Sequence, residues 1–291
     1  SEYLDVTPAS TKIVVSQLRL SNVLGDHVIT LDSPSFIVEK DDPSLTLQLS
    51  ESQRYQAVQI SGTPGGDSSP VIMELFEGFA RDIGQVRSRN QTFVNVTEYN
   101  DVVGPVLLRA EINYTFGNLT VFGSETLDAD PASQVSLDKF FLVDSAGDQN
   151  IGLVGAISVP SESLQIDIRL TEDQRVRAIA ISGTPGGDGG AIFLDVLGDA
   201  IQDIATARNF LTPNISVTEF PDSLLPTVIS ARLNFSTGQI SFFFSETIDL
   251  SPLSNFKLDQ IYLSNASDHE NVSIADAVLA SPDAVGFSAL L

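Results

Sequence analysis

The sequence repeats itself with a period of 121 residues. The runs Leu49–Asp67 and Leu170–Asp188 share 13 identical residues in 19 positions. The tripeptide at 113–115 (Asn-Tyr-Thr) returns in related form at 234–236 (Asn-Phe-Ser) after the same interval. Because similar sequences fold by the same local rules, a period of this length predicts an array of similar domains.

Turn-forming residues mark the boundaries between the copies. Pro105 and Pro226 stand 121 residues apart, and proline interrupts regular structure. We therefore expect three units, at 1–103, 104–224 and 225–291. With these boundaries the first unit lacks its opening strands and the third holds only its N-terminal part. We expect further repeats of the same chain, or a strand donated by another subunit, to complete them.

Apolar and polar residues alternate along most of each unit, a pattern typical of half-buried strands. Short alternating runs separated by Gly, Pro and Asn predict an all-β chain whose units are two-sheet sandwiches. The Gly-rich run Thr63–Asp67 is not followed by Gly-Lys-Ser/Thr, so it predicts a tight turn between strands and not a phosphate loop. A helical turn is expected at Glu74–Asp82 and at its counterpart Leu197–Thr206.

A Ser-Glu-x-x-Asp motif occurs three times, at Ser1–Asp5, Ser124–Asp128 and Ser245–Asp249. An Asp-x-Ala-x-x-x-Asn element lies at Asp203–Asn209. With the repeats around them, these motifs resemble the tandem Ig-like repeats of giant extracellular or surface proteins of algae and other protists. They are similar, more distantly, to Ig-like domains of bacterial surface-layer proteins. The resemblance spans nearly the whole chain and implies tandem Ig-like β-sandwiches with a spacer or fibre-forming role, without catalysis.

The composition excludes several functions. The chain has 38 acidic and 15 basic residues, so a nucleic-acid partner, which requires clustered positive charge, is not expected. No apolar run approaches the roughly 18 residues of a membrane-spanning helix. There is no Cys, and the three units share only two His, so no thiol or Ser-His-Asp chemistry recurs in each unit. We expect no enzyme.

N-glycosylation signals are the clearest indication of the compartment. Eight of the 13 Asn residues begin an Asn-x-Ser/Thr sequon, whereas the frequency of Ser and Thr predicts roughly 2. N-glycans require exposed acceptors in a secreted protein. We therefore expect N-linked glycans and an extracellular or cell-surface location reached through the secretory pathway. The acceptors are Asn90, Asn95, Asn113, Asn118, Asn214, Asn234, Asn265 and Asn271.

Calcium is the cofactor that the acidic motifs suggest, because calcium binds clustered oxygen ligands and could stiffen domain junctions. The alternative is that these acids are solvated loop charges. The candidate ligands are Glu98, Asp101, Glu125, Asp128, Asp130, Glu219, Asp222, Glu246 and Asp249. The predicted function is a structural segment of an extracellular filament or surface appendage that associates with itself end to end. A calcium-dependent adhesion module or a carbohydrate-binding module is the alternative.

Overall fold

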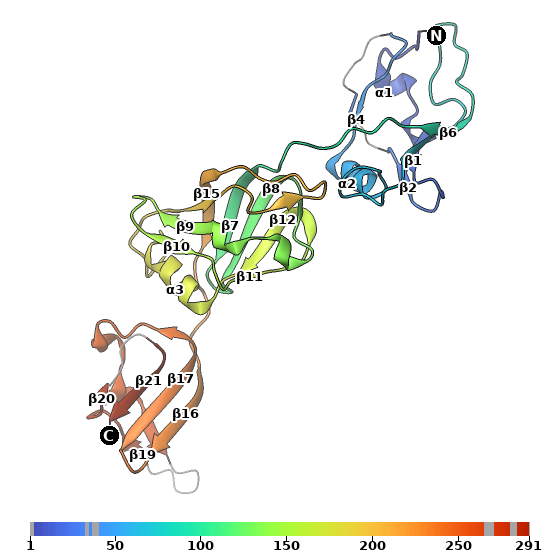
Figure 1. The fold of residues 1–291 in the computed structure, drawn as a ribbon. Helices are drawn as coiled ribbons and strands as arrows, with labels where there is room; N and C mark the ends of the chain where they lie inside the picture. Colours follow the sequence, from blue (N-terminus) through green and yellow to red (C-terminus); the bar gives the residue numbers. More distant parts are fainter. Residues whose placement is uncertain (1–2, 33–34, 37–40, 265–270, 280–283, 291) are drawn as a thin grey trace.

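The computed structural model describes residues 3–32, 35–36, 41–264, 271–279 and 284–290. Most of its regular structure is strand, arranged in several sheets whose pairs are nearly all antiparallel, which confirms the all-β prediction. Three bodies follow one another in chain order (Figure 1), and each contains its own cluster of buried apolar side chains.

The middle body is built on one curved set of strands. Its sheet order is β10-β9-β13-β15-β7-β8-β12-β11, with β14 paired to β8. The first half of β15 pairs antiparallel with β13, and its second half pairs parallel with β7, so this strand passes from one part of the sheet to the other. The bounds are β7 Leu107–Asn113, β8 Asn118–Asp128, β9 Phe140–Asp144, β10 Asn150–Gly152, β11 Ile157–Ser158, β12 Glu162–Arg169, α3 Glu172–Ala180, β13 Ile192–Val196, β14 Gln202–Asp203 and β15 Thr212–Phe220.

The first body repeats part of this plan in the sheet order β2-β1-β5-β6. Each of these strands lies about 121 residues before a strand of the middle body. The bounds are α1 Ala9–Lys12, β1 Leu18–Ser21, β2 Val28–Thr30, β3 Ser35–Phe36, β4 Leu47–Gln48, α2 Glu51–Gln59, β5 Ile72–Leu75 and β6 Gln91–Asn95.

The third body follows the same order of elements. Its sheets are β16-β17-β21-β20 and β18-β19. The bounds are β16 Val228–Asn234, β17 Gln239–Ile248, β18 Tyr262–Ser264, β19 Asn271–Ser273, β20 Val278–Leu279 and β21 Ala284–Leu290. Short 3-10 turns complete the regular structure at Val15–Gln17, Ala132–Gln134, Leu137–Lys139, Leu253–Asn255 and Leu258–Gln260.

The alternating residues form the core, as the sequence predicts. In β12 the side chains of Ile166 and Ile168 are fully buried while their neighbours are partly or fully exposed. They share one cluster with Leu142 of β9 and Leu194 of β13, so side chains from both halves of the sheet enter the same core. Removal of this apolar surface from water is the main force that holds the unit together.

The helices lie in places where the sequence analysis did not expect them. Segments 74–82 and 197–206 form strand ends and turns, so the helical prediction there is wrong. The nine-residue helices are α2 and α3, and each begins with a capping box, made by Ser50 with Gln53 and by Thr171 with Gln174. The turn at 63–67 therefore connects a helix to a strand and not two strands.

In the described part of the chain, no helix combines the length and the apolar character that a membrane crossing requires.

Candidate functional site

The junction between the first two bodies is organised around Arg54 of α2. Its Nε and Nη2 atoms donate to both carboxylate oxygens of Glu51, at 2.7 and 2.9 Å. Its Nη1 atom donates to Asp101 in the linker at 2.7 Å, and Nη2 also donates to Glu125 of β8 at 2.7 Å. One guanidinium therefore ties a helix of the first body to the linker and to a strand of the second.

Glu51 crosses the same junction on its own. Its Oε1 accepts hydrogen bonds from both the backbone N–H and the hydroxyl of Thr126, each at 2.8 Å. The hydroxyl of Tyr55, one turn further along α2, donates to Glu162 of β12. The capping box fixes the first turn of α2, so it also sets where Glu51 and Arg54 point.

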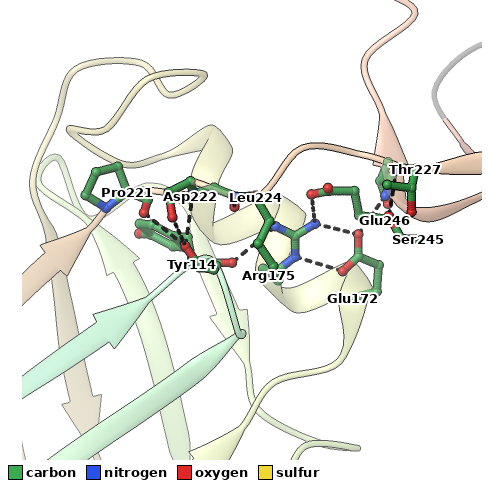
Figure 2. A network of polar contacts seen from close by, with 12 residues as sticks. Tyr114, Glu172, Arg175, Pro221, Asp222, Leu224, Thr227, Ser245 and Glu246 are labelled. Carbon is green, nitrogen blue, oxygen red and sulfur yellow. Dashed lines mark hydrogen bonds and ion pairs between the residues drawn. The ribbon is translucent and has the colours of Figure 1, made fainter.

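The second junction repeats this arrangement 121 residues later, around Arg175 of α3 (Figure 2). Arg175 donates to both oxygens of Glu172, each at 2.8 Å, and to Asp222 of the linker at 2.8 Å. It donates to Glu246 of β17 at 3.3 Å, and the N–H of Thr247 donates to Glu172 at 2.9 Å. We call each set of an arginine and its three acidic partners an arginine clamp.

The two clamps differ in burial. The Arg175 side chain is 8% exposed, whereas that of Arg54 is 25% exposed. Arg175 also donates to the backbone oxygen of Tyr114 at 3.2 Å. The second clamp is therefore the better shielded from solvent, and its charges interact more strongly.

The four glutamates of the clamps have shifted pKa values. Burial would raise the pKa of Glu51, but hydrogen bonds from Arg54 and Thr126 outweigh it and lower that pKa. Glu172 follows the same rule, with Arg175 and Thr247 as its donors. Burial raises the pKa of Glu125 to about 7 against the pull of Arg54, and Asp203 and Asp101 add to the rise. Burial also raises the pKa of Glu246, with Asp222 next in importance.

The structure divides the acids that the sequence suggested as calcium ligands. Four of them belong to the clamps: Asp101, Glu125, Asp222 and Glu246. The other five do not.

Glu98 and Glu219 instead accept backbone N–H groups inside their own units, from Gly62 and Val71 and from Gly183 and Ile192. Asp128 accepts from the side chain of Gln202, and Asp249 from that of Asn255. Asp130 is exposed and donates its N–H to Asp128. Glu98 and Asp128 therefore do not join Glu125 in the set of acids that the structure brings together.

Sequence reasoning missed the cationic members of the site and three of its acids, Glu51, Glu172 and Asp203. Arg54 and Arg175 fall on matching positions of the repeat, which is a signal that could have indicated them. The sequence analysis noted Asp203 of β14 only as part of the Asp-x-Ala-x-x-x-Asn element, yet Asp203 brings a carboxylate oxygen within 4.8 Å of oxygens of Asp101 and Glu125. No spacing in the sequence indicates that these three segments meet.

The predicted glycan acceptors differ in accessibility. Asn113 and Asn118 are half-buried at the ends of β7 and β8, and Asn265 lies outside the described residues. The remaining acceptors are exposed: Asn90, Asn95, Asn214, Asn234 and Asn271. Most of the described acceptors therefore stand where a glycan can be attached.

Neither a model of a known protein family nor a curated protein matches this chain.

Proposed function

We propose that this chain is a structural segment of an extracellular, N-glycosylated filament or surface appendage, built as a tandem array of Ig-like β-sandwiches of about 121 residues. The proposed units are 1–103, 104–224 and 225–291. The proposal includes secretion and an absence of catalysis. The observation that carries it is the recurrence of the arginine clamp at both junctions.

A recurring junction is what a spacer requires. A ligand site needs to occur only once in an array, whereas a stiff spacer must fix the angle at every junction. Here the same acceptor and donor positions recur 121 residues apart on the helix, the linker and the next strand. Each clamp places three chain segments around one guanidinium, so bending a junction would break charge-assisted hydrogen bonds.

The geometry of the junction also favours assembly of the chain with itself. Each clamp joins a helix of one unit to a different surface, the strand carrying the Ser-Glu motif, of the next unit. Contacts between unlike surfaces are head-to-tail, and they continue without closure when the rotation between units does not form a ring. Further units of this kind, in the same chain or in a neighbouring one, would extend a filament through the same contacts.

Glycans and charge would keep such filaments apart laterally. Sheet edges invite pairing with other sheets, and bulky sugars or like charges block it. A formal net charge of −23 makes neighbouring filaments repel each other, and the exposed sequons would add a soluble coat.

Small-angle scattering of the secreted protein tests the spacer role. We expect one narrow distribution of overall dimension for the unchanged chain and a broad one for the double variant Arg54→Ala, Arg175→Ala. Arg177→Ala is the matched control, because Arg177 lies on α3 but is 51% exposed, and its partners among the described residues are Asp173 of the same helix and the backbone oxygen of Asn150. A broad distribution for the unchanged chain would refute the stiff spacer.

A calcium-dependent adhesion role is the second candidate. One observation favours it, the carboxylates that surround Asp203 at the first junction.

A further inference from the structure

A cluster of three carboxylates lies beside Arg54 at the first junction. Asp101 of the linker, Glu125 of β8 and Asp203 of β14 each place one carboxylate oxygen within 4.8 Å of the other two. Among the residues that the structure describes, no second group of three acidic, His or Cys side chains is this tight. The three segments are remote in sequence, so folding alone brings the acids together.

Asp203 shows that this cluster is more than a patch of surface charge. Its side chain is fully buried, and its Oδ1 accepts the N–H of Ala207 at 2.8 Å. Its Oδ2 is buried as well and has no hydrogen-bond partner within the described ranges. Burial of a carboxylate oxygen without a partner is costly, so native proteins nearly always supply one. The unpartnered Oδ2 of Asp203 therefore indicates that a ligand binds here.

The charge around the cluster has the sign that favours a cation. Arg54 is shared among Glu51, Asp101 and Glu125, and two of its hydrogen bonds go to Glu51. Together with Asp203, four carboxylates face one guanidinium in a partly buried place. Carboxylates that lose their water without gaining a positive partner destabilise the folded state, because no ion pair compensates for the lost hydration.

We propose that Asp101, Glu125 and Asp203 bind a divalent cation, calcium in the first place, at the junction between units 1–103 and 104–224. Calcium takes six to eight oxygen ligands at about 2.3–2.6 Å, so two oxygens on one ion lie at most about 5 Å apart. The separations within the cluster satisfy that limit. Backbone oxygens and water would complete the shell, and calcium tolerates such irregular shells better than magnesium does.

The bound ion would tie β8, β14 and the linker together on the side of Arg54. Binding itself rests only on the cluster, whereas its role in stiffening the junction rests on the proposed spacer function. At the second junction Asp222 and Glu246 lie beside Arg175 in the positions that Asp101 and Glu125 take beside Arg54.

Calorimetric titration of the full chain with calcium chloride, and in parallel with magnesium chloride, tests the site. We expect one calcium site with a dissociation constant of about 0.1–1 mM, typical of extracellular modules, and weaker magnesium binding. Saturating calcium should raise the melting temperature, since a ligand that binds only the folded state stabilises it. Asp203→Asn should weaken binding at least tenfold while its amide oxygen still accepts from Ala207.

Two matched variants serve as controls. Asp82→Asn changes the repeat-equivalent residue of the first unit, which accepts the N–H of Val86 in the same way but is outside the cluster. Glu246→Gln changes the counterpart of Glu125 at the second junction. Both should bind calcium like the unchanged chain. If Asp203→Asn fails to fold, Glu125→Gln takes its place.

Three results would overturn the proposal: no calcium heat or melting shift up to about 10 mM, a calcium affinity unaffected by Asp203→Asn, or equal loss in the Asp82→Asn control. If acid raises the melting temperature while calcium has no effect, the cluster binds a proton in place of a cation, and the proposal is overturned as well. Small-angle scattering with and without calcium separates the calcium site from the spacer function. If calcium binds but the flexibility of the chain does not change, the calcium site stands and only the spacer role is refuted.

Discussion

Gly65 of the first unit lies directly against the backbone oxygen of Ile204 in the second. A Cβ atom on Gly65 would lie 1.9 Å from that oxygen, far inside contact distance. The loop that follows α2 therefore packs against the segment that follows β14, and this contact supplements the clamp at the same junction. Gly65 also has a φ of +88°, a conformation that favours glycine.

Gly65→Ala should open the first junction. The repeat-equivalent Gly186 has a similar φ of +96°, but the one neighbour that a Cβ there would meet among the described residues is the Cγ2 methyl of Ile179, at 3.3 Å. Gly186→Ala should therefore cost only the backbone strain, roughly 1–2 kcal/mol. We expect Gly65→Ala to cost more and to broaden the scattering profile, while Gly186→Ala leaves the profile unchanged. Identical profiles for the two variants would contradict this contact.

Arg175→Ala should destabilise the junction that it holds by about 3 kcal/mol, because it leaves three acids without their cation. Arg54→Ala should cost less, since its side chain is 25% exposed against 8% for Arg175. Arg175→Lys should recover only part of the loss, because an ammonium cannot present the planar fork that pairs with Glu172. Denaturant unfolding of each variant measures these differences.

A double variant checks the mechanism of that loss. When Glu246→Gln is added to Arg175→Ala, one uncompensated charge disappears, so the double variant should be more stable than Arg175→Ala alone. If the double variant instead loses the sum of the stabilities lost by the two single variants, Arg175 and Glu246 do not interact, which would contradict the structure.

The sequence predicted the strands well because their signal is local. The alternation that contains Ile166 and Ile168 is directly visible, and its burial follows from the pleat of a strand. The helices α2 and α3 were missed although Ser50 with Gln53 and Thr171 with Gln174 form the Ser/Thr-x-x-Gln signature of a capping box. That signature is local, so it could have indicated both helices.

The site was less predictable because its contacts join distant segments. Glu125 was proposed for its local motif, but its partner Arg54 lies 71 residues earlier. Asp203 meets Asp101 only because β14 pairs with β8 and so brings its end to the junction. Such pairings depend on the register of strands, which the residue types do not specify.

Tyr114 should make the middle unit sensitive to alkali. It is fully buried, and its hydroxyl donates to Glu219 at 2.8 Å. Burial first, and then the charge and hydrogen bond of Glu219, raise the pKa of Tyr114 far above the usual value of about 10. The unfolded chain loses this proton first as pH rises, so stability is full below about pH 10 and falls above it.

Absorbance of tyrosinate, followed together with circular dichroism, measures this effect. Tyr114 should titrate only as the unit unfolds. Tyr114→Phe, which copies the residue at the equivalent position 235, should remove that coupling and cost about 1.5–3 kcal/mol at neutral pH, since Glu219 loses a donor. Free titration of all tyrosines in the folded chain would contradict the buried hydrogen bond.

Glycan occupancy should follow accessibility, with one specific exclusion. Asn113 and Asn118 are directly opposite each other in the register of β7 and β8, and both are half-buried. Opposite Cβ atoms of an antiparallel pair are about 4.5–5.5 Å apart, which leaves no room for two branched glycans side by side. Asn113 also has a buried Oδ1 without a partner among the described residues.

We therefore expect that no single molecule carries glycans on both Asn113 and Asn118, whereas Asn234, the exposed counterpart of Asn113, is highly occupied. The other exposed acceptors, Asn90, Asn95, Asn214 and Asn271, serve as the reference for efficient modification. Intact-glycopeptide mass spectrometry of the secreted protein, on the peptide that spans 113–118, measures this directly. A doubly glycosylated peptide as the main species would refute the exclusion. Unmodified Asn at all the exposed acceptors would instead refute the N-glycosylated filament, because exposed sequons are open to modification in a chain that passes through the secretory pathway.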